Sequence, residues 1–206
     1  MAAGFQFWFE FASTYSYVAA LRIEAVAGAR CVPFEWRPFL LGPIFRRQGW
    51  NDSPFNLYPA RGRYMWRDVE RLCDKHGLPF RKPTVFPRNS LLAARVACAG
   101  AGQAWLAGFV RGVYTANFAE DRDISDAAVI EGILGAAGQD GAEVIARATS
   151  VDGKERLRRE TETAWELGIF GAPTCVVGRE LFWGNDRMDD ALDWYSTKGG
   201  TACPST

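Results

Sequence analysis

Strand-like segments lie near the two ends of the chain, and this arrangement constrains the fold more than any other sequence feature. Residues 5–11, FQFWFEF, are rich in aromatic side chains and predict a strand. Residues 15–27 carry apolar side chains at helical spacing and predict a helix that stops at Gly28. Residues 30–37, with Pro33 suggesting an edge or an early position in the strand, predict a second strand. Such a β-α-β opening favours a right-handed crossover and two parallel strands.

A second strand unit occurs near the C-terminus. Residues 174–177 and 180–183 predict two short strands that form a β-hairpin around a turn at Gly178. Apolar residues at helical spacing follow Asn185 and predict a final helix. The small polar residues of the tail, 198–206, predict disorder.

The long segment between these units, residues 39–167, has mostly helical periodicity. It begins with a Gly-, Pro- and Asn-rich stretch that is too aromatic for a plain linker and that we expect to line a site. One later helix is expected to begin with Ser125 as its N-cap, and the last is expected to span residues 154–167.

Together, β-α-β, helical insertion and β-β-α predict an α/β, thioredoxin-like architecture. A proline that precedes the third strand, Pro173, then lies beside the start of the first helix. We expect a thioredoxin-like domain of residues 1–38 and 168–197 with a large α-helical insertion of residues 39–167.

Composition narrows the classes of partner. The 206 residues are 48% hydrophobic, enough for one well-buried core. Lys plus Arg and Asp plus Glu number 24 each, so nucleic acid and anionic membranes are not expected partners, and a small molecule is favoured. The absence of a secretory signal or a long apolar span predicts a cytoplasmic protein.

Cysteine and histidine usage argues against metal sites and disulfide frameworks. The five cysteines include no C-x-x-C pair, which favours thiols in a reducing compartment. The single histidine, His76, precedes Gly77 and fits the C-terminal end of a helix. We therefore expect no metal site and no His-dependent catalytic triad.

Two serines, Ser13 and Ser16, stand three residues apart where the first helix begins. Serine at a helix start serves as an N-cap without any further function. The same position also places a hydroxyl beside unpaired backbone N–H groups, an arrangement that favours a bound anion. From the residues alone, both interpretations remain open.

Four stretches carry a resemblance to a known family: FEFASTYSY, RPFLLGPIF, FPRNSLLAAR and LGIFGAPTCVVGRELFWGNDRMDDAL. They resemble the 2-hydroxychromene-2-carboxylate isomerases, which are similar to kappa-class glutathione transferases and, more remotely, to the DsbA disulfide oxidoreductases. The resemblance covers almost the whole chain and implies the DsbA-like, kappa-class arrangement of the fold and a homodimer.

The resemblance implies glutathione as the cofactor, with the Ser13 hydroxyl donating to its thiolate. Because Ser13 and Ser16 occupy the places of the oxidoreductase cysteines, disulfide exchange is not expected there. Thr14 departs from the Ser-Pro usual in relatives and keeps a backbone N–H that proline lacks. The backbone of Ala172 is expected to pair with the cysteinyl unit of glutathione.

The γ-glutamyl end of glutathione is expected to bind Trp183, Gly184, Asn185 and Asp186. Asp186 accepts from its ammonium group, and N–H groups at the start of the last helix bind its carboxylate. As an alternative, Asn185 or Asp186 merely caps that helix.

Substrate contacts implied by the resemblance fall in the middle of the chain. Arg46 aligns with a lysine that contacts substrate in relatives, whereas Arg47 is expected on a solvated face. Asn51 and Arg61 fall near binding positions of kappa-like relatives, Arg61 with one residue of extra spacing. Asn89 is either a lining residue or a turn-forming asparagine.

The implied reaction interconverts 2-hydroxychromene-2-carboxylate and trans-o-hydroxybenzylidenepyruvate, an aromatic keto acid, in the bacterial breakdown of naphthalene-like aromatics. The thiolate adds reversibly to the conjugated alkene, the new single bond rotates, and elimination restores the alkene. Two alternatives remain, a kappa-like glutathione transferase or peroxidase and a glutathione-binding protein without turnover.

Overall fold

Four strands form one mixed sheet at the centre of the structure, a computed structural model that describes residues 4–198. The strands are β1 (Phe5–Phe9), β2 (Glu35–Pro38), β3 (Thr174–Val177) and β4 (Glu180–Trp183), in the order β2-β1-β3-β4. β1 pairs with β2 in parallel and with β3 antiparallel, and β3 and β4 form the predicted hairpin. The predicted thioredoxin-like α/β fold is confirmed. β2 lies at an edge of the sheet, but it begins at Glu35, so Pro33 precedes the strand that was expected over residues 30–37.

Helices, joined by loops and turns, make up the rest of the described chain. In chain order they are α1 (Thr14–Ala20), α2 (Ile23–Ala29), α3 (Leu41–Arg47), α4 (Pro54–Leu57), α5 (Pro59–His76), α6 (Leu91–Ala99), α7 (Leu106–Phe118), α8 (Ala127–Ala136), α9 (Gly141–Thr149), α10 (Val151–Glu166), the 3-10 helix η1 (Asn185–Arg187) and α11 (Met188–Thr197).

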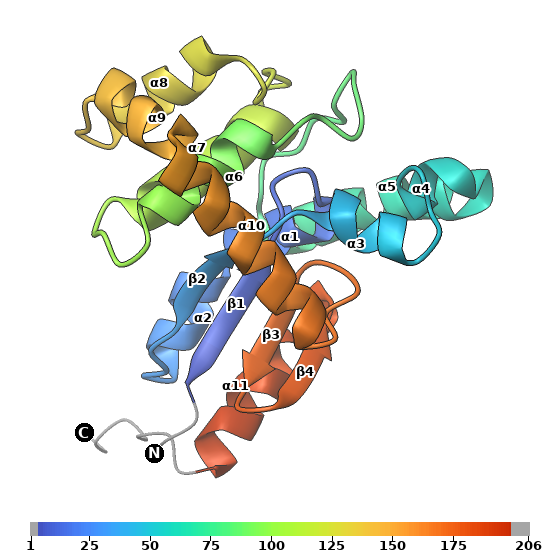
Figure 1. Ribbon diagram of the computed structural model, residues 1–206. Coiled ribbons are helices and arrows are strands. Elements are labelled where there is room, and N and C mark those ends of the chain that lie inside the picture. The colour runs from blue at the N-terminus through green and yellow to red at the C-terminus, as the bar shows by residue number, and fades with distance from the viewer. Residues whose placement is uncertain (1–3, 199–206) are drawn as a thin grey trace.

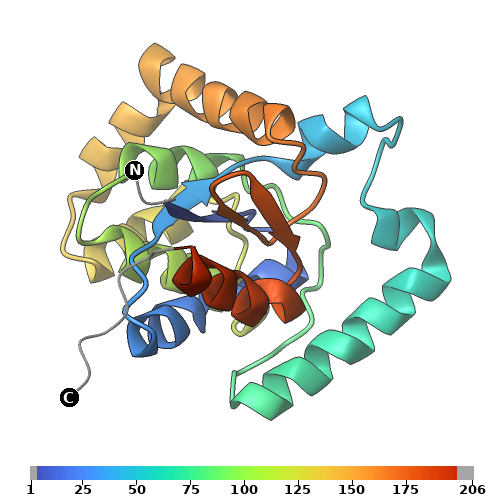
Figure 2. The same ribbon diagram turned by 90° about the horizontal axis from the view of Figure 1, so that it is seen from below.

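The sheet is sandwiched between helices. α10 crosses one face, while α2 and α11 cover the other, as Figure 2 shows from below. Side chains of β1 alternate between the two faces. Phe5, Phe7 and Phe9 enter the main core, which continues into the helical block, whereas Trp8 packs toward α10 with Ala164. Because the main core runs through both parts of the chain, the division into a domain of residues 1–38 and 168–197 and an insertion of residues 39–167 stays a prediction.

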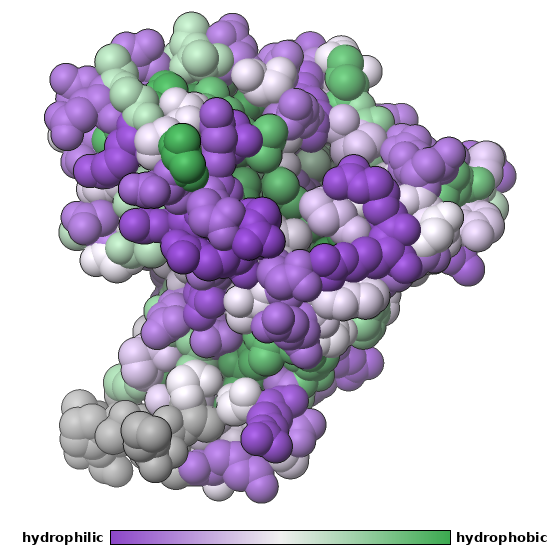
Figure 3. All heavy atoms as spheres, viewed as in Figure 1, coloured by the Kyte–Doolittle hydropathy of each residue, from purple (hydrophilic) through white to green (hydrophobic). Residues whose placement is uncertain are grey.

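The helices bury most of their apolar side chains and leave polar side chains on the outer surface. The face seen in Figure 3 is mostly hydrophilic, with hydrophobic residues in scattered groups. Across the described residues, every helix is too short or too polar to cross a lipid bilayer.

The single helix expected over residues 15–27 is wrong, because the chain breaks between α1 and α2. Arg22 adopts φ −112° at this break, and its guanidinium donates to Asn185 Oδ1 in η1 at 3.1 Å. This contact joins segments far apart in the sequence, so local periodicity does not show it. Gly28 lies inside α2, which ends one residue later.

Two predicted helix ends have different outcomes. α8 begins after Asp126, whose carboxylate accepts from the N–H of Ala128, so the predicted cap at Ser125 is wrong by one residue. Ser125 instead donates its backbone N–H to Asp123. His76 ends α5 as predicted, and Gly77 follows with φ 64°, a left-handed conformation that glycine adopts without strain. The tail predicted to be disordered lies outside the described residues from position 199.

Candidate active site

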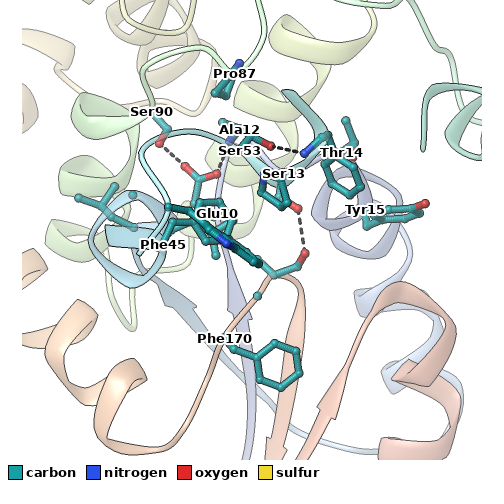
Figure 4. Close-up of a pocket in the computed structure, with 18 of the residues that line it drawn as sticks. Glu10, Ala12, Ser13, Thr14, Tyr15, Phe45, Ser53, Pro87, Ser90 and Phe170 are labelled. Atoms are coloured by element: carbon teal, nitrogen blue, oxygen red, sulfur yellow. Dashed lines mark hydrogen bonds between the residues drawn. The ribbon is translucent and has the colours of Figure 1, made fainter. Parts of the chain in front are cut away.

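The site begins where β1 ends and α1 starts. Ser13 has an extended backbone, φ −79° and ψ 121°, and its Oγ accepts from the N–H of Ser16 at 3.2 Å. The N-cap prediction is therefore confirmed. The same Oγ donates to the carbonyl oxygen of Ala172 at 3.0 Å, so the cap also faces the segment before β3 (Figure 4).

The neighbours of Ser13 point away from it. Ser16 is fully buried, and its hydroxyl lies beside Tyr114 in the core. The Thr14 hydroxyl bonds the sulfur of Met65 at 3.1 Å. Tyr15 donates to Asp68 at 3.0 Å, and burial together with this carboxylate raises the pKa of the Tyr15 hydroxyl. Ser13, Thr14 and Tyr15 all line the cavity, and Ser13 is the one of them whose hydroxyl bonds the backbone of the segment before β3.

The segment that precedes β3 also lies against Ser13. The Ala172–Pro173 peptide bond is cis, and the carbonyl of Pro173 accepts from the N–H of Gly184 at 2.9 Å. This bond ties the end of β4 to the segment before β3. Trp183 is 52% exposed and packs against Phe170, with ring centroids 4.9 Å apart.

The residues after Trp183 do not cap the last helix. η1 precedes α11, and the start of neither element is capped by a side chain. Asn185 is buried and held by Arg22, whereas Asp186 is exposed, with its carboxylate 3.6 Å from Arg187 Nε. The capping alternative for Asn185 and Asp186 is therefore wrong, because both residues lie inside η1 and no side chain caps the start of α11.

The opposite wall comes from α3, the α3–α4 loop, α5 and the segment before α6. Arg46 and Asn51 are exposed, and within residues 4–198 Arg46 has no ion-pair partner. Arg61 lies 4.7 Å above the ring of Tyr58. Asn89 accepts from the N–H of Leu91 at 3.0 Å, so it forms a turn before α6 as one alternative predicted.

All ten predicted site residues line one cavity of about 1400 Å³. They are Ser13, Arg46, Asn51, Arg61, Asn89, Ala172, Trp183, Gly184, Asn185 and Asp186. Arg47, expected on a solvated face, pairs outside the cavity with Glu162 at 2.6 Å. The structure thus brings the predicted residues together, whereas their individual roles stay predictions.

No thiol contributes to this cavity among the described residues. Cys73, Cys98 and Cys175 are free and buried elsewhere, and burial raises the pKa of each thiol. Cys31 is disulfide-bonded, so the expectation of free thiols is wrong there. Cys31 is exposed after α2, whereas the three free thiols are buried.

Glu10 is a cavity residue that sequence reasoning missed. Its carboxylate accepts from the N–H of Ala12 at 2.9 Å and from the hydroxyl of Ser90 (Figure 4). Burial raises the pKa of Glu10 from the ordinary 4.5 to about 7, despite these donors. The sequence feature that could have revealed Glu10 is an acidic residue within the aromatic segment 5–11, three residues before Ser13.

Arg88 was missed as well. It is buried in the wall, where its guanidinium pairs with Asp121 and donates to the side chain of Asn117 at 3.1 Å. These bonds anchor the segment that carries Asn89 and Ser90. A buried arginine with its donors engaged in this way holds the wall in place.

Comparisons with known proteins agree with this geometry. The family model described as DSBA-like thioredoxin domain matches residues 5–196. A 2-hydroxychromene-2-carboxylate isomerase of Sphingobium xenophagum is 28% identical over 92% of this chain and 96% of its own length. The glutathione s-transferase kappa 2 of Caenorhabditis elegans is 24% identical over 93% of this chain and 91% of its own.

A solved structure shows the same fold. The selenomethionine structure of a 2-hydroxychromene-2-carboxylate isomerase superposes with a TM-score of 0.84 at 24% identity, covering 94% of each chain. At that identity the likeness concerns the fold alone.

Proposed function

The chain belongs to the DSBA-like thioredoxin domain family, and from this premise we propose that it is an isomerase that uses glutathione on an aromatic keto acid. We assign it the interconversion of 2-hydroxychromene-2-carboxylate and trans-o-hydroxybenzylidenepyruvate, as named for its isomerase relatives and implied by the family resemblance. The observation that carries the proposal is the Ser13 hydroxyl, which faces the backbone of Ala172 inside a cavity that has no cysteine of its own among its lining residues.

The cavity wall fits glutathione in its chemistry. Ala172 offers a carbonyl whose hydrogen-bond partner is a hydroxyl that can turn away. Asp186 offers an exposed carboxylate suited to an ammonium group, beside the aromatic ring of Trp183. The cavity, at about 1400 Å³, has room for a tripeptide and a second molecule.

Glutathione, when bound, supplies a thiolate that adds reversibly to the substrate's conjugated alkene and so permits rotation about that bond. Ser13 donates its Oγ–H toward the sulfur and favours the ionised form. A hydrogen bond to a charged group contributes about 1.5 to 3 kcal/mol, which corresponds to about one to two pKa units. This is enough to bring a thiol of ordinary pKa, about 8.5, near neutrality.

The other wall binds the keto acid. Arg46 directs its guanidinium to the substrate carboxylate, for which it is free because it has no ion-pair partner within residues 4–198. Phe45 and Trp50, with ring centroids 5.6 Å apart, supply an apolar surface for the aryl ring. Asn51, Arg61 and Asn89 complete this side. From the family resemblance we also propose a cytoplasmic homodimer that serves the breakdown of naphthalene-like compounds.

The direct test mixes the protein with the ring-opened keto acid and follows its ultraviolet spectrum. We expect equilibration with the chromene form only when glutathione is present. Full activity of protein freed of copurified glutathione, without any added thiol, overturns the cofactor assignment. No spectral change with glutathione present overturns the isomerase assignment.

A glutathione transferase is the second candidate, supported by the kappa relative that matches 93% of this chain. The two reactions differ in what happens to glutathione. An isomerase recycles it, whereas a transferase consumes one molecule for each product formed. Measuring free thiol during turnover therefore distinguishes them, since its concentration stays constant for the isomerase.

A further inference from the structure

Glu10 is an ionisable side chain enclosed at the inner end of the cavity. It is 5% exposed, follows the last residue of β1, and lies on the cavity wall three residues before Ser13. Its carboxylate accepts from the N–H of Ala12, and its backbone carbonyl accepts from the N–H of Ser13 at 3.0 Å, at the same chain turn that presents the Ser13 hydroxyl. A charge on Glu10 therefore sits close to the place proposed for the sulfur.

The groups that face Glu10 are neutral hydrogen-bonding partners. Ser90, which precedes α6, donates its hydroxyl to one carboxylate oxygen, and Ala12 donates to the other. Tyr114 of α7 donates to the backbone carbonyl of Glu10 at 2.9 Å. Arg88 of the cavity wall pairs with Asp121, and within residues 4–198 no cation pairs with Glu10.

A buried acid without a cation is costly to ionise, and this makes it a proton acceptor when a better site for the charge becomes available. An ionised Glu10 and a thiolate beside Ser13 would be two like charges in one enclosed space, and such pairs share one proton. Resting on the proposed function, we propose that Glu10 is a catalytic residue that takes up the proton of the glutathione thiol when glutathione binds and returns it on release.

The exchange balances without any other reactant. As an O–H bond forms on a carboxyl oxygen of Glu10, the S–H bond breaks, and the negative charge passes from the carboxylate to the sulfur. The site carries one negative charge before and after. The pKa of Glu10, about 7, is close to the value that Ser13 can give the thiol, so neither direction is strongly uphill.

Proton counting on binding tests this role directly. Glutathione is titrated into wild type and into Glu10→Gln by calorimetry, in buffers that differ in ionisation enthalpy, at pH values below and above the pKa of Glu10. Glutamine keeps the shape and the contact with Ala12 but cannot take a proton. Above the pKa of Glu10 and below the ordinary thiol pKa of about 8.5, wild type releases close to no protons, whereas Glu10→Gln releases close to one.

The pH dependence gives a second signature. Below its pKa, Glu10 is already protonated, and a bound thiol whose pKa lies near 7 also stays largely protonated, so both proteins release few protons and become alike. Ser90→Ala removes a donor that favours the carboxylate and so raises the pKa of Glu10 further. Just above pH 7, Glu10 is then already protonated in this variant, so glutathione binding releases protons that wild type does not release. Ser90→Ala keeps the test open if Glu10→Gln fails to fold.

A matched control is Asp68→Asn, which removes a different carboxylate of the cavity wall. Its proton count should equal that of wild type. Equal counts in wild type and Glu10→Gln above the pKa of Glu10, with glutathione bound to both, overturn the role of Glu10 and leave the proposed function standing. Failure of wild type to bind glutathione at all overturns the proposed function and this inference together.

Discussion

The Ser13 hydroxyl donates to the carbonyl oxygen of Ala172 at 3.0 Å, across 159 positions of sequence. Ser13 has one hydroxyl proton, and in this arrangement that proton is donated to the carbonyl of Ala172. A ligand N–H that pairs with Ala172 would replace this bond and free the hydroxyl for a sulfur. Ser13 and Ala172 therefore form one unit, in which backbone pairing and thiolate stabilisation depend on each other.

Ser13→Ala removes both the cap and the donor. Loss of the N-cap should lower the free energy of unfolding by about 1 kcal/mol, which leaves the protein folded. The thiol pKa of bound glutathione should rise by about one to two units, and isomerisation at neutral pH should fall at least tenfold. Thiolate absorbance as a function of pH measures the first effect, and the rate of spectral change measures the second.

Ser16→Ala is the control for this experiment. Its hydroxyl is buried beside Tyr114 and does not line the cavity, so the thiol pKa should match that of wild type. An unchanged thiolate titration in Ser13→Ala would refute the role given to Ser13.

Gly184→Ala should weaken glutathione binding by displacing Asp186. Gly184 has φ 114°, a conformation that costs a residue with a side chain about 1 to 3 kcal/mol, and an added Cβ would lie 2.4 Å from Asp186 Oδ1. We expect the Kd for glutathione to rise about tenfold, which corresponds to about 1.4 kcal/mol. Calorimetric titration gives the Kd.

Gly178→Ala serves as the matched control. Gly178 also has a positive φ, 64°, but it lies in the β3–β4 turn outside the cavity. It should lower stability without changing the Kd. An equal loss of affinity in both variants would show that backbone strain, and not the position of Asp186, is responsible.

Arg46→Ala should raise the KM for the keto acid about tenfold, because the variant lacks the cation for the substrate carboxylate. Arg46→Lys should lie between wild type and alanine, since lysine keeps the charge without the planar fork. The adjacent residue offers a control. Arg47 pairs with Glu162 outside the cavity, so Arg47→Ala should leave KM unchanged. A wild-type KM in Arg46→Ala removes Arg46 from the substrate site.

Glu10 should make stability fall as pH rises. Its pKa is about 7 in the folded protein against 4.5 ordinarily, so between these values the folded state binds more protons than the unfolded state. The penalty is absent below the ordinary pKa and complete above the folded pKa. At about 1.4 kcal/mol per pKa unit, it amounts to about 3 kcal/mol.

Denaturant unfolding of wild type and Glu10→Gln at both ends of this pH range measures the effect. The difference in the free energy of unfolding between the two proteins should shift in favour of Glu10→Gln at high pH. A difference that does not depend on pH would mean that the Glu10 carboxyl titrates normally.

The sequence by itself determined the elements whose signals are local. The β3–β4 hairpin lies at the predicted residues, because two short apolar runs on either side of the turn at Gly178 specify it without distant partners. The cap at Ser13 and the helix end at His76 also depend on neighbouring residues alone. The family resemblance, in turn, indicated which residues to look for in the site.

Only the tertiary structure decided which groups meet. Arg22, at the break between α1 and α2, donates to the distant Asn185, and the burial that raises the pKa of Glu10 depends on packing against segments that carry Ser90 and Tyr114. Desolvation and long-range hydrogen bonds arise from the whole packed chain, so no local pattern encodes them. For this reason the sequence predicted the serine that lines the cavity but not the buried acid three residues before it.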